Sequence, residues 1–144
     1  MNKILVAIDF SEKTPLIISQ IQDIATSTDS QIFLVHITPP NPDFVGFETG
    51  PQSERDFLAH QFREEHRKIQ QLAEALRKQE LKAVGLLLNG STVETIITEA
   101  EKLNVNLIVV GSHGRTGLVK ILVGSVSEGI LRRAKVPVLV VPTR

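Results

Sequence analysis

The chain has 144 residues, of which 42% are hydrophobic and 22% are charged, and its 16 Lys and Arg balance 16 Asp and Glu. This length and composition predict a single globular domain over residues 1–144 and exclude a largely disordered chain. A formal net charge of zero provides no overall field to recruit nucleic acid or an anionic membrane, and the absence of cysteine excludes disulfides, thiolate nucleophiles and Cys-ligated zinc. No apolar run is long enough to cross a bilayer and the first residues lack a signal-peptide layout, so we expect a cytoplasmic protein.

Short apolar runs, which predict buried strands, alternate with amphipathic patterns, which predict helices. In chain order the predicted elements are a strand at 4–8, a helix at 14–28, a strand at 32–35, a helix from 54 to about 80, a strand at 84–88, a helix at 91–100, a strand at 107–110, a helix at 125–134 and a strand at 136–141. The loop at 38–53 is rich in Pro and Gly but holds two Phe residues. It either packs locally against the body or forms a flap near a ligand or partner.

Polar residues mark the expected helix starts. Thr14 precedes Pro15 and is predicted as an N-cap, and the Ser-x-x-Glu patterns that begin at Ser91 and Ser125 are typical of capping boxes. In the last helix, Val126 is expected on the apolar stripe.

Strands of the buried type that alternate with helices predict an α/β fold, with a doubly wound parallel sheet and helices on both faces. Ligands in such sheets bind beyond the carboxyl ends of the strands, where the strand order reverses. Asp9, Ile37 and Gly111 fall just after predicted strands, so we expect them to converge on one edge of the sheet.

The stretch 111–125 joins a buried strand to a helix start and contains four glycines. A helix start carries unpaired N–H groups and partial positive charge, which favour a phosphate, so this stretch is a candidate anion site. It lacks the Gly-Lys-Ser/Thr of a Walker A loop and the Gly-x-Gly-x-x-Gly spacing of a Rossmann loop. A plain turn is the alternative.

The spacing of Gly111, Gly114 and Gly124-Ser125 resembles the ATP-binding signature of the universal stress protein family. The opening Ile-Leu-Val-Ala-Ile-Asp-Phe-Ser, the Val35-His36 pair and the closing Pro-Val-Leu-Val-Val are also similar to that family. The resemblance implies a five-stranded parallel sheet of order 3-2-1-4-5 in one domain. It also implies a stress-response protein that binds ATP, with or without Mg²⁺, between the first and fourth strands.

The same resemblance implies roles for individual residues. Asp9 would meet the ribose or the adenine edge, and Ile37 would offer backbone groups and an apolar wall to adenine. Gly111 would let the ribose approach closely. The residues that would line the triphosphate are Gly114, Gly124, Ser125 and Val126. Alternatives remain: Asp9 could cap the turn before the first helix, Ser125 could use its hydroxyl to cap its own helix, and Arg115 and Lys120 could be solvated or neutralise phosphate.

Three further functions were weighed against an ATP-binding regulatory protein with slow hydrolysis at most. An enzyme of the adenine-nucleotide α-hydrolase type would usually have a Ser-Gly-Gly-type loop where residues 9–12 read Asp-Phe-Ser-Glu. A phospho-receiver domain would need an acceptor Asp where Asn89 stands. A dimeric interaction module without nucleotide turnover stays open, and an ATP titration separates it from the first reading. No catalytic residue is assigned.

The last predicted strand suggests how the chain assembles. In the implied order this strand lies at the sheet edge. Residues 137–141 contain no charged side chain that would discourage pairing with a strand of another chain. Two copies paired about a twofold axis would close the edge, so a homodimer through this strand is expected. A short edge that stays solvated is the alternative, and a client protein is unknown.

Overall fold

The computed structural model describes residues 2–38, 52–112 and 124–143 of the chain. In the helix that begins at residue 52, side chains are described from residue 56 onward. In chain order the elements are β1 (Lys3–Ala7), α1 (Thr14–Thr28), β2 (Gln31–Thr38), α2 (Gln52–Arg77), β3 (Lys82–Asn89), α3 (Thr92–Leu103), β4 (Leu107–Gly111), α4 (Ser125–Arg133) and β5 (Val138–Val141). The alternation of strand and helix read from the sequence is confirmed.

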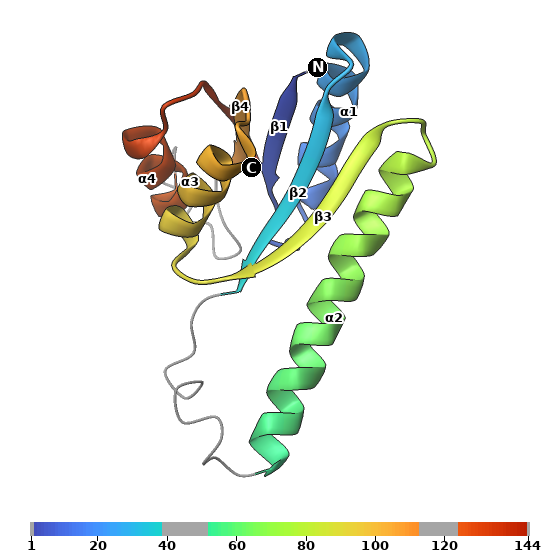
Figure 1. Cartoon of the computed structure of the whole chain (residues 1–144), viewed down its shortest axis with the longest axis vertical. Helices are drawn as coiled ribbons and strands as arrows, with labels where there is room; N and C mark the ends of the chain where they lie inside the picture. Colours follow the sequence, from blue (N-terminus) through green and yellow to red (C-terminus); the bar gives the residue numbers. More distant parts are fainter. Residues whose placement is uncertain (1, 39–51, 113–123, 144) are drawn as a thin grey trace.

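The strands form one five-stranded sheet in the order β3-β2-β1-β4-β5, and every neighbouring pair is parallel (Figure 1). The strand β1 therefore lies in the centre, with Leu5 opposite Phe33 of β2 on one side and Ile108 of β4 on the other. The predicted α/β fold and its strand order are confirmed. The order reverses between β1 and β4, which is where a ligand site is expected.

Helices cover both faces of the sheet: in Figure 1, α3 and α4 lie on one side of the strands and α1 and α2 on the other. On one face Ile21 of α1 and Ile69 of α2 pack against Val6 and Leu34, and all four side chains are fully buried. On the other face Ile96 of α3 and Ile130 of α4 pack with Leu5 and Ile108 in a second buried cluster. Burial of such side chains is worth about 1.5–3 kcal/mol each, so the two clusters fix the sheet as a rigid platform.

Several local predictions were wrong. The N-cap of α1 is Lys13 and not Thr14, whose side chain is instead buried in the first turn. The helix α4 begins at Ser125, as predicted, but its N-cap is Gly124 and there is no side-chain cap hydrogen bond, so the capping box at Ser125 is not formed. The residues of this helix that are buried against the body are Ser127 and Ile130. This register leaves Val126 38% exposed and off the apolar stripe. Ser91 does cap α3, but without a side-chain hydrogen bond, so its capping box is not formed.

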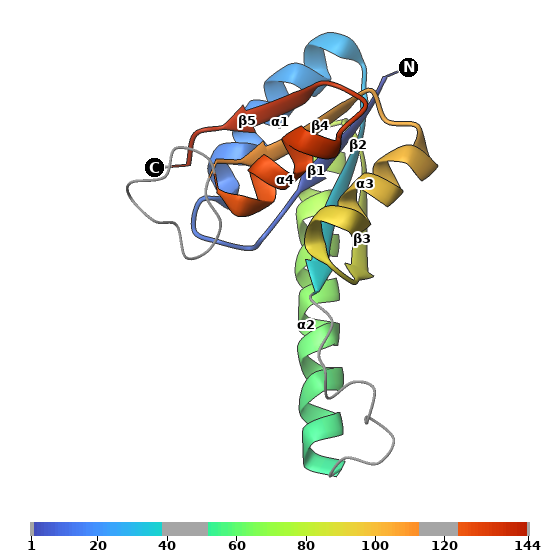
Figure 2. The same cartoon turned by 90° about the vertical axis from the view of Figure 1, so that its left-hand side faces the viewer.

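The helix α2 is longer than the sheet is deep. Its first turns project beyond the carboxyl ends of the strands, while its later turns pack on β3 and β2 (Figures 1 and 2). Phe57 and Phe62 lie on the projecting part and are 66% and 43% exposed, so Phe62 does not belong to the buried stripe of this helix. The middle of α2 consequently passes beside the edge of the sheet where the ligand site is expected.

Candidate functional site

Three neighbouring strands end together at the candidate site. Asp9 comes two residues after β1, Ile37 is the penultimate residue of β2, and Gly111 is the final residue of β4. Because β1 lies between β2 and β4, these residues meet at one edge of the sheet, as the sequence predicted. This edge includes the point where the strand order reverses.

The turn after β1 is held by local hydrogen bonds. Oδ1 of Asp9 accepts a hydrogen bond from the backbone N–H of Ser11 at 3.0 Å, and the hydroxyl of Ser11 accepts one from the N–H of Lys13 at 3.2 Å. Between them Phe10 adopts a left-handed backbone conformation with φ of 57°, which is uncommon for a residue with a side chain. The turn-capping role considered for Asp9 is therefore present, and it fixes where this carboxylate lies.

Ile37 presents backbone groups to the place where β1 leaves the sheet. Val35 accepts from the N–H of Ile8 at 2.8 Å, and Thr38 accepts from the N–H of Gly90 at 3.0 Å, so odd-numbered residues of β2 face β1 and even-numbered residues face β3. The N–H and C=O of Ile37 therefore point to the β1 side, beyond Ile8. Its side chain is buried in the core under α3 and α4.

The start of α4 is tied directly to the end of β4. The N–H of Gly124 donates to the carbonyl of Ser112, and the hydroxyl of Ser127 donates to the carbonyl of Gly111. Ser112 is in turn fixed to the end of β5, because its N–H donates to Val141 at 2.8 Å. The first-turn N–H groups of a helix have no partner within the helix, and helix starts of this kind can bind anions. The helix start at Ser125 and Val126 therefore brings such N–H groups to this edge of the sheet.

Two of the predicted site residues, Gly114 and Arg115, lie outside the described residues, as does Lys120. The predicted site residues within the described part of the chain are Asp9, Ile37, Gly111, Gly124, Ser125 and Val126. They fall into two groups: the ends of β1 and β2 form one, and the end of β4 with the start of α4 forms the other. Val126 is exposed at this helix start, which suits contact with a ligand better than the core position first expected.

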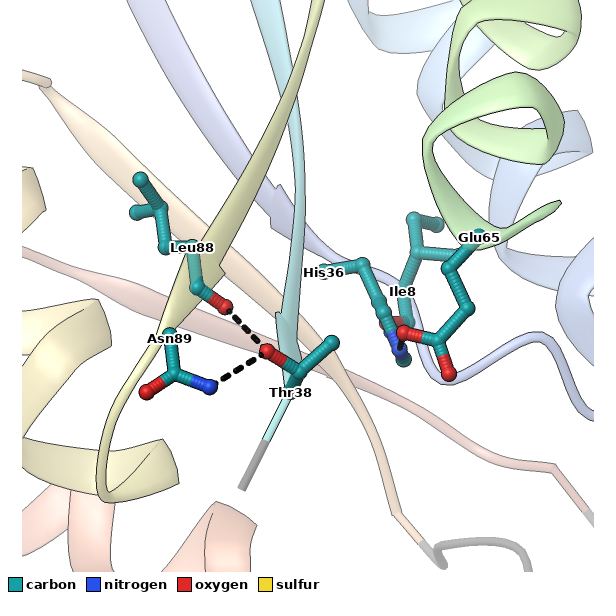
Figure 3. Close-up of polar contacts among 6 residues, drawn as sticks. All are labelled: Ile8, His36, Thr38, Glu65, Leu88 and Asn89. Carbon is teal, nitrogen blue, oxygen red and sulfur yellow. Dashed lines mark hydrogen bonds and ion pairs between the residues drawn. The ribbon is translucent and has the colours of Figure 1, made fainter. Parts of the chain in front are cut away.

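Sequence reasoning missed the residues that support the site. His36 was noted only beside Ile37, yet its ring is buried and its Nδ1 lies 2.6 Å from the carbonyl oxygen of Ile8, with Glu65 of α2 on its other side (Figure 3). Ser127 was treated as part of a capping pattern, whereas its hydroxyl binds Gly111. One sequence feature could have pointed to His36: it follows directly on the apolar run 32–35, which predicts a buried side chain. Because buried polar side chains need hydrogen-bond partners, a specific contact for this histidine could have been expected.

The described part of the chain offers neither a metal cluster nor a membrane-spanning helix. Over residues 2–38, 52–112 and 124–143 no group of three or more His, Asp and Glu side chains is arranged to hold a metal ion. Within the same ranges, no helix combines the length and apolar character needed to traverse a bilayer.

Comparison with known proteins gives a consistent result. The Universal stress protein family matches residues 1–142. Universal stress protein MJ0577 of Methanocaldococcus jannaschii is 27% identical over 152 residues, which cover 97% of this chain and 94% of that protein. A solved structure of MJ0577 superposes with a TM-score of 0.84 and covers 99% of this chain and 96% of that one.

Two more distant structures share the fold and were solved with nucleotides. The universal stress protein from Archaeoglobus fulgidus in complex with dAMP is 18% identical, with a TM-score of 0.67 and coverage of 97% of both chains. A universal stress protein in complex with cAMP is also 18% identical, with a TM-score of 0.68 and coverage of 99% of this chain and 98% of that one.

Proposed function

Because this chain belongs to the universal stress protein family, we propose that it binds an adenine nucleotide, ATP foremost, and acts as a regulatory protein in a stress response. The observation that carries the proposal is the convergence of Asp9, Ile37 and Gly111 with the start of α4 at the point where the strand order reverses. The complexes of related folds with dAMP and cAMP support an adenine nucleotide as the ligand class. A cytoplasmic location belongs to the same proposal, because cellular adenine nucleotides are found there.

The two groups of site residues would bind different parts of the nucleotide: the ends of β1 and β2 the adenine and ribose, and the end of β4 with the start of α4 the ribose and phosphates. Asp9 would accept hydrogen bonds from the ribose or the adenine edge, and the backbone of Ile37 would meet adenine. Gly111 would admit the ribose, and Gly124 would line the phosphate side without a side chain in the way. Ser125 and Val126 would bind phosphate oxygens through backbone N–H groups. From the motif alone, Gly114 and Arg115 complete the phosphate side. A Mg²⁺ ion would be held mainly by the phosphates and water.

Hydrolysis should be slow at most. The residues assigned to the site position phosphates, but none of them is a general base aimed at an attacking water. A phosphate-release assay with ATP and Mg²⁺ checks this expectation. Turnover near the enzyme median of about 10 s⁻¹ would instead favour an enzyme of the α-hydrolase type.

A homodimer through β5 is part of the proposal. Pro137 accepts a hydrogen bond from Ile108 of β4 at 3.0 Å, and Val141 accepts one at 2.8 Å from Ser112, the residue after β4. Val138 and Val140 therefore turn their backbone groups to the opposite side, away from β4. β5 is the last strand in the sheet order, and no strand of the described part of the chain pairs with its outer side, so a second copy could pair there.

The strand pattern makes this dimer testable with one substitution. Val140→Pro removes an outward N–H and leaves the hydrogen bonds to β4 in place, so light scattering should show a monomer where the parent chain is a dimer. Circular dichroism checks that the fold survives. A parent chain that is monomeric at micromolar concentration would refute this assembly.

Nucleotide choice is tested by a competition experiment. The purified chain is loaded with a fluorescent ATP analogue, and ATP, ADP, AMP, cAMP and GTP are compared as competitors. The proposal expects every adenine nucleotide to compete and GTP to compete much more weakly. Equal competition by GTP would contradict adenine recognition at Ile37.

A further inference from the structure

A buried histidine and a partly buried glutamate lie together beside the proposed nucleotide site. The side chains of His36 and Glu65 are 9% and 18% exposed, and Nε2 of His36 lies 3.4 Å from Oε2 of Glu65. That separation is within ion-pair distance but longer than a usual hydrogen bond, and Oε2 is a buried atom without a hydrogen-bond partner in the described part of the chain. His36 lies near the end of β2 and Glu65 in the middle of α2, so the pair joins the sheet edge to the long helix (Figure 3).

The two nitrogens of His36 have different partners, and this fixes the ring. A carbonyl oxygen can only accept, so the 2.6 Å contact with Ile8 requires a proton on Nδ1. On the other side, Nε2 faces Oε2 of Glu65 within ion-pair distance. The carboxyl group of Glu65 therefore lies where it can hold the ring in the orientation that binds Ile8.

The same ring supports the turn that contains Asp9. The ring centroids of Phe10 and His36 are 4.3 Å apart. Lys68 of α2 also contacts the Phe10 ring, with its Nζ 5.7 Å from the ring centroid. Phe10 is the residue with the left-handed backbone, so its side-chain contacts help to hold a conformation that is costly by itself. Asp9 stands between the two residues that His36 contacts, Ile8 and Phe10.

We infer that His36 is a positioning residue for nucleotide binding, which fixes the Asp9 turn through Ile8 and Phe10 and is itself oriented by Glu65 of α2. The inference rests on the proposed function. It makes α2 part of the site without contact between this helix and the ligand, so a change in α2 would alter nucleotide affinity.

Two substitutions of His36 test separately the contacts made by its Nδ1 and its Nε2. The amide nitrogen of Asn can occupy the place of Nδ1 and donate to Ile8, whereas that of Gln reaches the place of Nε2 and cannot. Both variants lose the ring against Phe10, so they are matched controls for each other. By calorimetry with ATP, His36→Gln should bind about tenfold more weakly than His36→Asn, which corresponds to the loss of one hydrogen bond. Equal affinities would overturn the inference.

Substitutions on α2 test the second half of the inference and serve if the His36 variants do not fold. Glu65→Gln can still donate to Nε2 of His36 and should bind ATP within about threefold of the parent, whereas Glu65→Leu should bind about tenfold more weakly. The matched control is Glu64→Gln: Glu64 is the neighbouring carboxylate, and its bond to Arg67 at 2.6 Å lowers the pKa of Glu64 on the exposed side of the helix. Equal ATP affinity in Glu65→Leu and Glu64→Gln would overturn the role of Glu65.

A spectroscopic measurement distinguishes positioning from a general effect on stability. In ¹H–¹⁵N spectra of the parent chain, His36 should show a protonated Nδ1, and the amide signals of residues 8–11 should shift in Glu65→Leu but not in Glu64→Gln. A parent chain that binds no adenine nucleotide would overturn the proposed function and this inference together. Normal binding that depends on Asp9, with unchanged signals at residues 8–11, would overturn this inference alone.

Discussion

The two ends of the sheet are built differently. At the amino end, β1 is bound to its neighbours on both sides: the N–H of Gln31 donates to Asn2, and Asn106 and Lys3 exchange two hydrogen bonds. At the carboxyl end, β1 leaves its neighbours after Ala7, whereas β2 stays paired with β3 and β4 with β5 to the last residue of each strand. Side chains bind carbonyls at this end, as His36 does at Ile8 and Ser127 at Gly111.

This difference fits a division in which one end stabilises the fold and the other is proposed to bind the nucleotide. Hydrogen bonds at the amino end satisfy backbone groups within the fold itself. Where β1 leaves its neighbours at the carboxyl end, the backbone groups of Ile37 point past the end of β1, toward the proposed adenine position. Substitutions at the two ends should therefore separate an effect on affinity from an effect on stability.

The largest effect is expected from Gly124→Val. Gly124 has φ of −72° and ψ of 167°, an extended conformation that valine adopts readily, so the backbone should tolerate the change. The branched side chain would stand at the helix start where phosphate is proposed to bind, and ATP affinity should fall by about a hundredfold or more. Calorimetry measures the affinity, and circular dichroism tests the fold. Unchanged affinity in a folded variant would exclude the start of α4 as the phosphate site.

A smaller loss is expected from Asp9→Ala. The carboxylate is proposed to accept a hydrogen bond from the nucleotide, and the loss of a charged hydrogen bond costs about 1.5–3 kcal/mol, or roughly tenfold to a hundredfold in affinity. Asp23→Ala is the control, because Asp23 is an exposed carboxylate on α1. If both variants bind ATP like the parent, Asp9 serves only to cap its turn.

Ser127→Ala should affect both stability and affinity. Its hydroxyl is buried and binds the carbonyl of Gly111, so the change leaves that carbonyl without this donor and should cost about 1–2 kcal/mol in the free energy of unfolding. Because the same bond aligns α4 with β4, ATP affinity should also fall a few-fold. Urea unfolding and calorimetry on one preparation give both numbers, and a stability loss with unaltered affinity would show that this bond does not position the site.

The smallest effect on the site is expected from Asn106→Ala at the opposite end. Oδ1 of Asn106 accepts from the N–H of Lys3 at 2.8 Å in an exposed position, so unfolding should become easier by about 0.5–1.5 kcal/mol. ATP affinity should not change, because this bond lies at the amino ends of β1 and β4. A loss of affinity comparable to that of Ser127→Ala would contradict the division between the two ends.

Periodic patterns predicted the fold well because each strand and helix buries one continuous stripe. Ile4 to Ile8 and Ile32 to Val35 are apolar runs whose burial follows from composition alone. The strand order came from the resemblance to a family, since local patterns do not specify which strands are neighbours. The helix starts at Thr14 and Ser125 were predicted, but the N-caps were not: they are Lys13 and Gly124, one residue earlier in each case. In α4, the burial of Ser127 and Ile130 and the bond of Ser127 to Gly111 go with this register.

The supporting residues of the site were beyond prediction from sequence patterns. His36 and Glu65 are 29 positions apart and belong to elements of different type, so no periodicity links them. Their contact depends on how far α2 extends past the sheet, which is set by packing of its later turns on β2 and β3. Asp9 and Gly111, by contrast, could be located because each follows directly on a recognisable strand.

The most direct test of the account is a calorimetric titration of the purified chain with ATP, after any co-purified nucleotide has been removed and identified by mass spectrometry. The account predicts saturable binding of one ATP per chain, and its loss in Gly124→Val while Asn106→Ala binds like the parent. A folded parent chain that shows no saturable binding of ATP, ADP or AMP at millimolar concentration would contradict it.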